Sequence, residues 1–370
     1  MDIDRATPET GGDAPLFESC ERTTEVLIEK RKLRSAVPLI HELRLRCGQQ
    51  DDLTTDLQYF MASNALSDRR VVAVLIRRRQ QLEACVLFVE HCRFGLGLGL
   101  FRGGDGSGEG LVVGPRRFHL QYVHLATQSL LRDWRVHGIS LAVNSSLEQC
   151  LQVLGPQSKY RMFSERSMGR TLRLESTYQA MLGAMGPRTR RSLAAKRRQL
   201  EARAQVLFLP SLEPGQALEA MLRLRRRSRP LRSAGFHRAR YTLLRDRGEF
   251  FCMGMRLPDG AWLSILSGWR QDRVTHIDLQ MNDLHYKKES LSAVMRAYML
   301  EHEIASRQQF INFVGGSSLL LGRYCQPAGP STDIFLWRPC LRATLAKLVT
   351  PRMKQESIYT RVGLLGLLEN

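Results

Sequence analysis

One short segment in the second half of the chain alternates polar and apolar residues, and two of its polar residues can exchange protons. The segment VTHIDLQMN, residues 274–282, predicts a β-strand with four polar side chains on one face, namely His276, Asp278, Gln280 and Asn282, because strand side chains alternate. A histidine or carboxylate on a cleft wall can take a proton from a nucleophile. We therefore predict that His276 and Asp278 are catalytic and that Gln280 and Asn282 line a substrate groove. The alternative is an edge strand with one solvated face.

A second segment, FINFVGGSSLLLGRY (residues 310–324), predicts a buried strand that ends in a glycine pair. Gly315 and Gly316 would let the backbone approach a ligand closely, and Tyr324 follows shortly after them. A tyrosine at this place could donate a proton to a leaving group. The alternative is a tight turn followed by a half-buried tyrosine.

The elements that must position these residues recur in the same order. Residues 111–143 and 274–314 each predict a strand, a short loop, a helix and a second strand. Further strands are predicted at 71–78, 83–101, 250–257 and 261–270, with a hairpin tip at Asp272 and Arg273 before the strand 274–282. A helix is predicted over 23–47, interrupted at Pro38. Two copies of a mixed α/β unit fit this order and the length of 370 residues. The predicted fold class is therefore α/β (α+β), with two tandem units, each a mixed sheet flanked by helices.

The composition excludes several classes of protein. The eight cysteines are scattered, without a CxxC pair or a histidine at zinc-binding spacing, which predicts reduced thiols, a cytoplasmic location and no metal site. No apolar run approaches the roughly 20 residues of a membrane span. The glycine spacings of dinucleotide-binding and phosphate-binding loops are also absent. The formal net charge of +19 favours anionic partners without saying which.

Much of this charge lies in two clusters, residues 185–205 and 223–240. The first, MGPRTRRSLAAKRRQLEARAQ, predicts a helix with a narrow apolar stripe at Leu193 and Leu200, and it includes Arg190 and Arg197. A solvated face is the usual explanation of such a run. A surface that faces a polyanion or an anionic membrane is the alternative, because the same sign recurs in both clusters.

The segments YQAMLGAMGPRTRRSLAAKRRQLE, THIDLQMN, YKKESLSAVMRAYMLEHEIASRQQFINFVGGSS and GRY together resemble the CelD/BcsL-type acetyltransferases of the GNAT superfamily. This group is linked with cellulose and exopolysaccharide biosynthesis, and it is related to the Fem-type aminoacyl transferases. The resemblance covers roughly residues 60–330 and is strongest over 178–198 and 276–324.

The resemblance implies two GNAT-like halves that transfer an acyl group from acetyl-CoA or another acyl-CoA to an amine or hydroxyl acceptor, without a metal. The turn that would hold the CoA pyrophosphate reads NDLHYKKESL and contains no glycine, so Lys287, Lys288 and Ser290 would serve with the helix N-terminus. The resemblance further implies that Gly315 and Gly316 contact the cofactor and that the helix carrying Arg190 and Arg197 borders the substrate groove.

The implied organisation has five parts: a disordered tail (1–22), an N-terminal half (23–175), a basic connecting helix region (176–210), a catalytic C-terminal half (211–330) and an extension (331–370). Two other functions stay open. One is a Fem-like transferase that uses aminoacyl-tRNA, whose phosphates the basic clusters would hold. The other is a non-catalytic scaffold that binds nucleic acid or attaches peripherally to an anionic membrane, for which the glycine-free turn is the best support.

Overall fold

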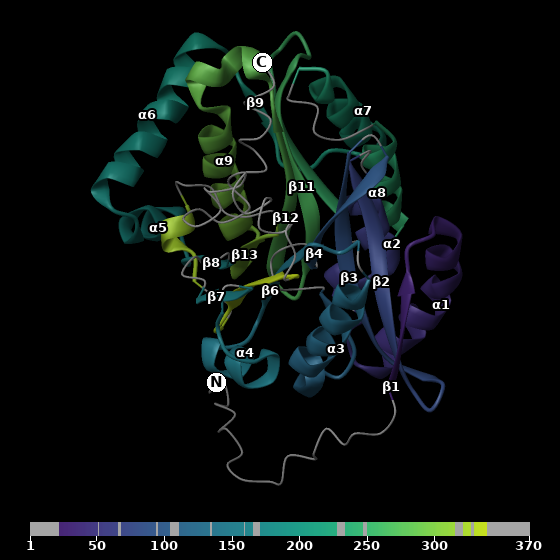
Figure 1. The fold of residues 1–370 in the computed structure, drawn as a ribbon. Coiled ribbons are helices and arrows are strands. Elements are labelled where there is room, and N and C mark those ends of the chain that lie inside the picture. Colours follow the sequence, from purple (N-terminus) through teal and green to yellow (C-terminus); the bar gives the residue numbers. More distant parts are fainter. Residues whose placement is uncertain are drawn as a thin grey trace.

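The computed structural model describes residues 22–50, 52–65, 68–93, 95–103, 111–133, 135–158, 160–165, 171–227, 234–246, 250–314, 321–326 and 329–338. These residues form two mixed β-sheets, each flanked by helices (Figure 1). The fold class predicted from the sequence is thereby confirmed. None of the helices within these ranges is long and apolar enough to cross a bilayer.

The first sheet contains eight strands. Its strand order is β1-β2-β3-β4-β6-β14-β7, with β5 paired to β3, and only β4 and β6 run parallel. The strands are β1 (Arg22–Leu27), β2 (Arg69–Arg78), β3 (Gln81–Arg93), β4 (Leu96–Gly103), β5 (Val112–Val113), β6 (Gly138–Val143), β7 (Arg161–Glu165) and β14 (Thr332–Trp337).

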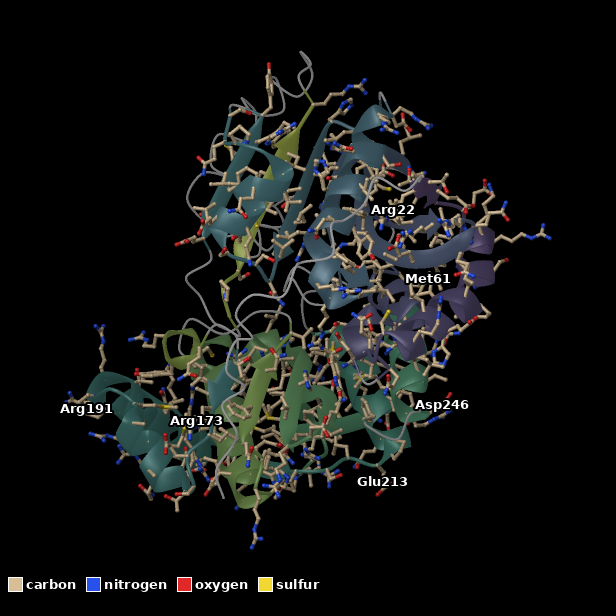
Figure 2. All side chains as sticks on the ribbon, turned by 90° about the horizontal axis from the view of Figure 1, so that it is seen from below. Arg22, Met61, Arg173, Arg191, Glu213 and Asp246 are labelled. Atoms are coloured by element: carbon tan, nitrogen blue, oxygen red, sulfur yellow. The ribbon has the colours of Figure 1, made fainter. Side chains whose placement is uncertain are left out.

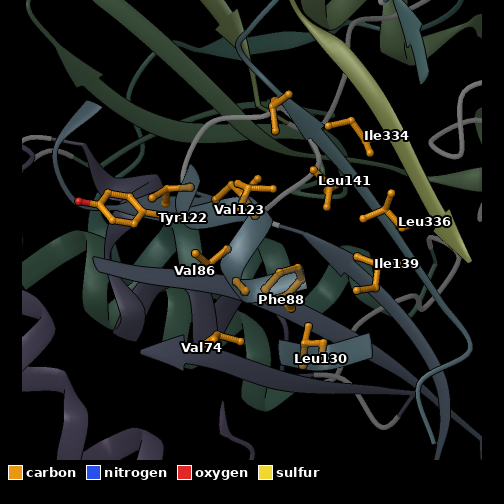
Figure 3. Close-up of a cluster of buried hydrophobic side chains, with 14 of the residues drawn as sticks. Val74, Val86, Phe88, Tyr122, Val123, Leu130, Ile139, Leu141, Ile334 and Leu336 are labelled. Atoms are coloured by element: carbon orange, nitrogen blue, oxygen red, sulfur yellow. The ribbon is translucent and has the colours of Figure 1, made fainter. Parts of the chain in front are cut away.

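Helices cover both faces of this sheet, because β2 and β3 are apolar on both sides. Val74, Val86 and Phe88 face α3 (His119–Arg132), and the buried side chains of α3 fill the space above them (Figure 3). Leu75 and Leu87 point the other way, toward α1 (Lys30–Arg46) and α2 (Leu57–Ser63). The remaining helix, α4 (Leu147–Leu154), starts at a capping box in which Ser146 and Gln149 bond reciprocally.

The second sheet contains six strands in the order β8-β13-β12-β11-β10-β9, and only β12 and β13 run parallel. The strands are β8 (Thr171–Arg173), β9 (Leu207–Leu209), β10 (Phe250–Arg256), β11 (Trp262–Gln271), β12 (Val274–Asn282) and β13 (Phe310–Phe313). One face packs against α7 (Pro214–Arg225) and α8 (Ala234–Asp246), and the other packs against α5 (Tyr178–Ala184), α6 (Pro187–Arg203) and α9 (Leu291–Ala305) (Figure 1).

Two short strands cross between the halves of the chain. β14 lies within the predicted C-terminal extension, yet it inserts between β6 and β7 of the first sheet, where Ile334 and Leu336 are buried. β8 lies within the predicted N-terminal half, yet it pairs with β13 of the second sheet. The predicted domain boundaries stay a prediction, but sheet membership does not follow them at these two places.

The local predictions have mixed outcomes. The helix predicted over 23–47 is wrong at its start, because residues 22–27 form β1 and pair with β2; α1 then runs through Pro38. Asp272 and Arg273 form the hairpin tip between β11 and β12, with φ values of 47° and 61°. On α6 the predicted stripe is confirmed, since Leu193 and Leu200 are buried. Residues 1–21, 104–110 and 339–370 lie outside the described residues.

Candidate functional site

The strand predicted over 274–282 is confirmed as β12, but the prediction that its four polar side chains share one face is wrong, because a β-bulge shifts the alternation partway along the strand. Burial alternates along the strand: Thr275, Ile277, Leu279 and Met281 are buried, whereas the four residues between and after them are partly exposed. His276 and Asp278 face the α8 side, where His276 stacks on Trp269 and Asp278 meets Arg240. Gln280 and Asn282 face the α9 side, where Gln280 meets Arg296. The position of β12 at the middle of the second sheet, between β11 and β13, excludes the alternative of an edge strand.

β12 and β13 are paired along only part of β12. Their parallel pairing runs from Val274–Phe310 to Ile277–Phe313, and it closes with a hydrogen bond of 2.9 Å from the Val314 N–H to the Ile277 carbonyl. β11 continues beside β12 as far as Asn282. Within the described residues, β12 from Asp278 to Asn282 thus lacks a strand partner on its β13 side. We call this segment the strand opening.

A β-bulge lies where the strand opening begins. Ser267 of β11 pairs with Leu279 and Gly268 pairs with Ile277, so Asp278 is the extra residue on β12. A bulge of this kind re-aims the side chain that it carries. The backbones approach so closely that a Cβ atom on Gly268 would lie 1.7 Å from the His276 carbonyl oxygen. Glycine is therefore required at position 268 for this geometry.

His276 is held in an aromatic and partly buried setting. Its ring stacks on Trp269 with a centroid distance of 4.9 Å and an interplanar angle of 4°, and its Nδ1 lies 3.4 Å from Asn312 Nδ2. Burial lowers the pKa of His276 from its usual value, and the nearby carboxylates Asp52 and Asp278 oppose this change. The imidazole is consequently neutral at neutral pH, the state that a general base needs.

Asp278 is engaged in a buried ion pair. Its carboxylate accepts hydrogen bonds from Arg240 on α8 and from the Tyr59 hydroxyl on α2, the latter at 2.8 Å. The Arg240 side chain is fully buried and that of Asp278 is 7% exposed. We call these three residues the buried triad. Its contacts favour a positioning role for Asp278, and the catalytic role inferred from sequence stays a prediction.

Tyr324 is bound at the junction of α5 and α6. Its hydroxyl accepts a hydrogen bond from the Gly186 N–H at 3.0 Å and donates one to Thr189 Oγ1 at 2.9 Å. Among the described residues, neither of these contacts belongs to β12. The structure therefore places Tyr324 against the start of the basic helix and does not bring it into contact with His276.

The predicted cofactor residues fall largely outside the described part of the chain. Gly315 and Gly316 lie outside the described residues, as do the side chains of Lys287 and Lys288. Their backbone belongs to the 3₁₀ helix 284–289, which leads into α9. Ser290 is the N-cap of α9 in the left-handed conformation (φ 54°), and its side chain makes no capping hydrogen bond. The 3₁₀ helix 284–289 thus separates the end of β12 from the first turn of α9.

The two arginines predicted to border the groove differ in setting. Arg190 is exposed on α6, and Figure 2 shows the neighbouring Arg191 pointing away from the body of the protein. Arg197 is bound within the fold, because it forms ion pairs with Glu201 at 2.9 Å and Glu301 at 2.7 Å and lies over the Tyr298 ring. Arg197 therefore ties α6 to α9, and Arg190 is free to face solvent.

Gln280 and Asn282, the remaining predicted groove residues, take part in a hydrogen-bonded chain. Ser264 Oγ donates to Asn282 Oδ1 at 2.8 Å, and Arg296 Nε on α9 donates to Gln280 Oε1 at 3.0 Å. Gln280 Nε2 in turn lies 3.5 Å from Asn282 Oδ1. We call these four residues the polar chain.

Sequence reasoning missed Tyr59, Arg240, Asn312 and Arg296 as members of the site. One signal was available: Arg296 interrupts a helix that is otherwise apolar over most of its length. Tyr59 and Arg240 come from segments distant in sequence and carried no local signal. Across the described residues no group of three His, Cys, Asp or Glu side chains is arranged to hold a metal ion.

No protein-family model matches the chain, and no curated protein matches it. Several solved structures are similar in arrangement. A tandem GNAT protein from the clavulanic acid biosynthesis pathway has 12% identity and a TM-score of 0.46, covering 85% of this chain and 98% of its own. FemX has 11% identity and a TM-score of 0.47, covering 88% and 99%. The N-myristoyltransferase of Saccharomyces cerevisiae, solved with bound myristoyl-CoA, has 11% identity and a TM-score of 0.45, covering 90% and 82%.

Proposed function

We propose that the chain is a GNAT-like acyltransferase that moves an acetyl or other acyl group from acyl-CoA to an amine or hydroxyl acceptor. The observation that supports this most is the strand opening, where two parallel strands separate beside a neutral histidine and the chain leads from β12 through the 3₁₀ helix 284–289 to the N-terminus of α9. Unpaired backbone N–H groups on β12 can hold a thioester carbonyl, and an open helix N-terminus attracts phosphate.

In this proposal His276 is the general base. It takes a proton from the acceptor as the acceptor nitrogen or oxygen attacks the thioester carbon. The new C–N or C–O bond forms, the C–S bond breaks, and the CoA thiolate leaves and takes up a proton. The buried triad holds the bulged segment of β12 in place, and it thereby positions His276, which lies two residues before Asp278.

The donor-binding residues in this proposal are Lys287, Lys288 and Ser290, with Gly315 and Gly316 against the pantetheine arm. The proposal also includes Tyr324 as general acid and Arg190 as a groove residue. It further includes a CelD/BcsL-type role in exopolysaccharide or cell-envelope metabolism and a cytoplasmic location.

A second candidate is a Fem-like transferase that uses aminoacyl-tRNA. The observation that favours it is the exposed basic surface of α6, where Arg188, Arg190, Arg191 and Arg198 face solvent. Such a surface binds RNA phosphates with an affinity that falls steeply with salt.

Calorimetric titration of the nucleic-acid-free protein with acetyl-CoA tests the first candidate. We expect micromolar binding that Lys287→Ala/Lys288→Ala weakens at least about tenfold, because two charged contacts to phosphate are lost. The control Lys30→Ala/Lys32→Ala removes the same charge from exposed positions on α1 and should bind normally. No binding of acetyl-CoA, together with salt-sensitive binding of tRNA, would favour the second candidate.

A further inference from the structure

Arg296 is a buried cation on the face of α9 that packs against the second sheet. Arg296 is 9% exposed, and its neighbours on the same helix are mostly apolar. Its guanidinium lies over the Phe313 ring, 5.1 Å from the centroid. Nε donates to Gln280, but Nη1 is buried and has no hydrogen-bond partner in the described part of the chain. The fold thus satisfies only part of this side chain.

Among the described residues no carboxylate compensates the charge of Arg296 by an ion pair. Residues 315–320, which follow Val314 in sequence, include no acidic residue. Burial lowers the pKa of Arg296 to about 10, with only the Cys325 thiol opposing this change. A buried cation without a counter-ion is costly. A ligand that supplies the counter-ion would remove this cost.

The guanidinium lies next to the strand opening. Gln280 belongs to the part of β12 that has separated from β13, and Phe313 is the last residue of β13. Gln280 is itself held by Ser292, whose carbonyl accepts from Gln280 Nε2 at 3.4 Å, and by Asn282. The polar chain therefore holds Nε of Arg296, whereas Nη1 has no partner among the described residues.

We propose that Arg296, oriented by Gln280, binds a single carboxylate or phosphate group of a substrate that enters the strand opening. This proposal rests on the function proposed above and narrows its substrate class to molecules with an anionic group near the reacting end. The depth of the site excludes extended polyanions, because a side chain that is 9% exposed is within reach of a small terminal group only. A guanidinium matches both oxyanions geometrically.

The test compares the wild-type protein with Arg296→Met, which keeps the length and removes the charge, and with Arg296→Lys and Gln280→Leu. Three probes are titrated: acetyl-CoA, succinyl-CoA and inorganic phosphate. We expect Arg296→Met without ligand to melt at or above the wild-type temperature, because an unpaired buried charge is gone. It should bind one anionic probe about tenfold or more weakly and acetyl-CoA about equally.

The probes separate the two ligand chemistries. A preference of the wild type for succinyl-CoA over acetyl-CoA that vanishes in Arg296→Met identifies a carboxylate, and loss of phosphate binding alone identifies a phosphate. Gln280→Leu, which removes the Nε acceptor, should weaken the same probe. Arg296→Lys should restore binding in part, since a lysine keeps the charge without the planar geometry.

Two results would overturn the proposal. One is an affinity for both anionic probes that is unchanged in all three variants. The other is a large loss of stability in Arg296→Met that Glu289→Gln reproduces, because this would show an internal ion pair with the acidic residue just before α9. Failure of the wild type to bind any CoA thioester would count against the proposed acyltransferase instead, and the phosphate titration would still decide the role of Arg296.

Discussion

The buried triad should be a main energetic link between the two halves of the chain, and Asp278→Asn tests this directly. The variant keeps the side-chain volume and removes the charge that Arg240 requires. Arg240 is fully buried and Asp278 is 7% exposed, so water cannot replace the lost carboxylate. Removing one partner of such a pair costs about 3–5 kcal/mol, whereas exposed pairs contribute about 0–1 kcal/mol.

Urea unfolding followed by tryptophan fluorescence measures this cost. Trp269 is a suitable reporter, because it packs edge-on against Tyr59 and stacks on His276. Glu301→Gln is the matched control: it removes a carboxylate from the half-exposed ion pair with Arg197 and should change the free energy of unfolding by less than about 1 kcal/mol.

A double-mutant cycle with Arg240→Met isolates the pair. Once Arg240 is gone, Asp278→Asn should cost about 1–3 kcal/mol less than it does alone, since no unpaired cation is left behind. A cost for Asp278→Asn as small as that of Glu301→Gln, with no coupling in the cycle, would refute the reasoning. Asp278 would then be free to act as a catalytic base.

Two further predictions concern the catalytic assignments. The pKa of His276 is lowered by burial, so the folded protein binds this proton less readily than the unfolded chain does. The stability that neutral His276 contributes should therefore be complete above pH 6.5 and decrease as the pH falls through the folded-state pKa. The decrease of kcat/KM at acid pH should likewise have its midpoint below pH 6.5, and it should disappear in His276→Gln. A decrease at acid pH that survives this substitution would assign the base to another residue. Tyr324→Phe should destabilise the protein by about 1 kcal/mol through its lost contacts with Gly186 and Thr189. Because Tyr324 is the proposed general acid, the variant should also lower kcat about a hundredfold or more; a loss of less than tenfold would remove the general-acid role.

The strand at β12 was predictable because alternating polar and apolar residues are a local property of the chain. The hairpin tip at Asp272 and Arg273 and the buried stripe of α6 were predictable for the same reason. Each of these features is encoded within one turn or one strand. The face of each side chain was not predictable, because the bulge at Asp278 shifts the alternation and turns Gln280 to the opposite side of the sheet from His276 and Asp278.

The contacts that Asp278 makes with Tyr59 and Arg240 could not be predicted from the local sequence either. Tyr59 and Asp278 are 219 positions apart in sequence, and Arg240 is 38 positions from Asp278. Periodicity states that Asp278 points to a half-buried side, but it does not state that a buried arginine meets it there. The sheets to which β8 and β14 belong were not predicted for a related reason. The sequence of a short apolar strand does not indicate which sheet the strand joins.

The crossing of β14 has a consequence for the geometry around His276. After β13 the chain passes the 3₁₀ turn 322–324, where Tyr324 is bound to the start of α6, and then pairs along its full length with β6 and along most of it with β7. The chain thus passes from the first sheet to β8 of the second and returns from β13 to β14 of the first, so two connections limit how far the halves can separate. Interfaces held only by side chains leave domains free to move. Here the two connections and the buried triad together restrict the movement of Tyr59 relative to β12, which favours a site whose residues from both halves are already in place before substrate arrives.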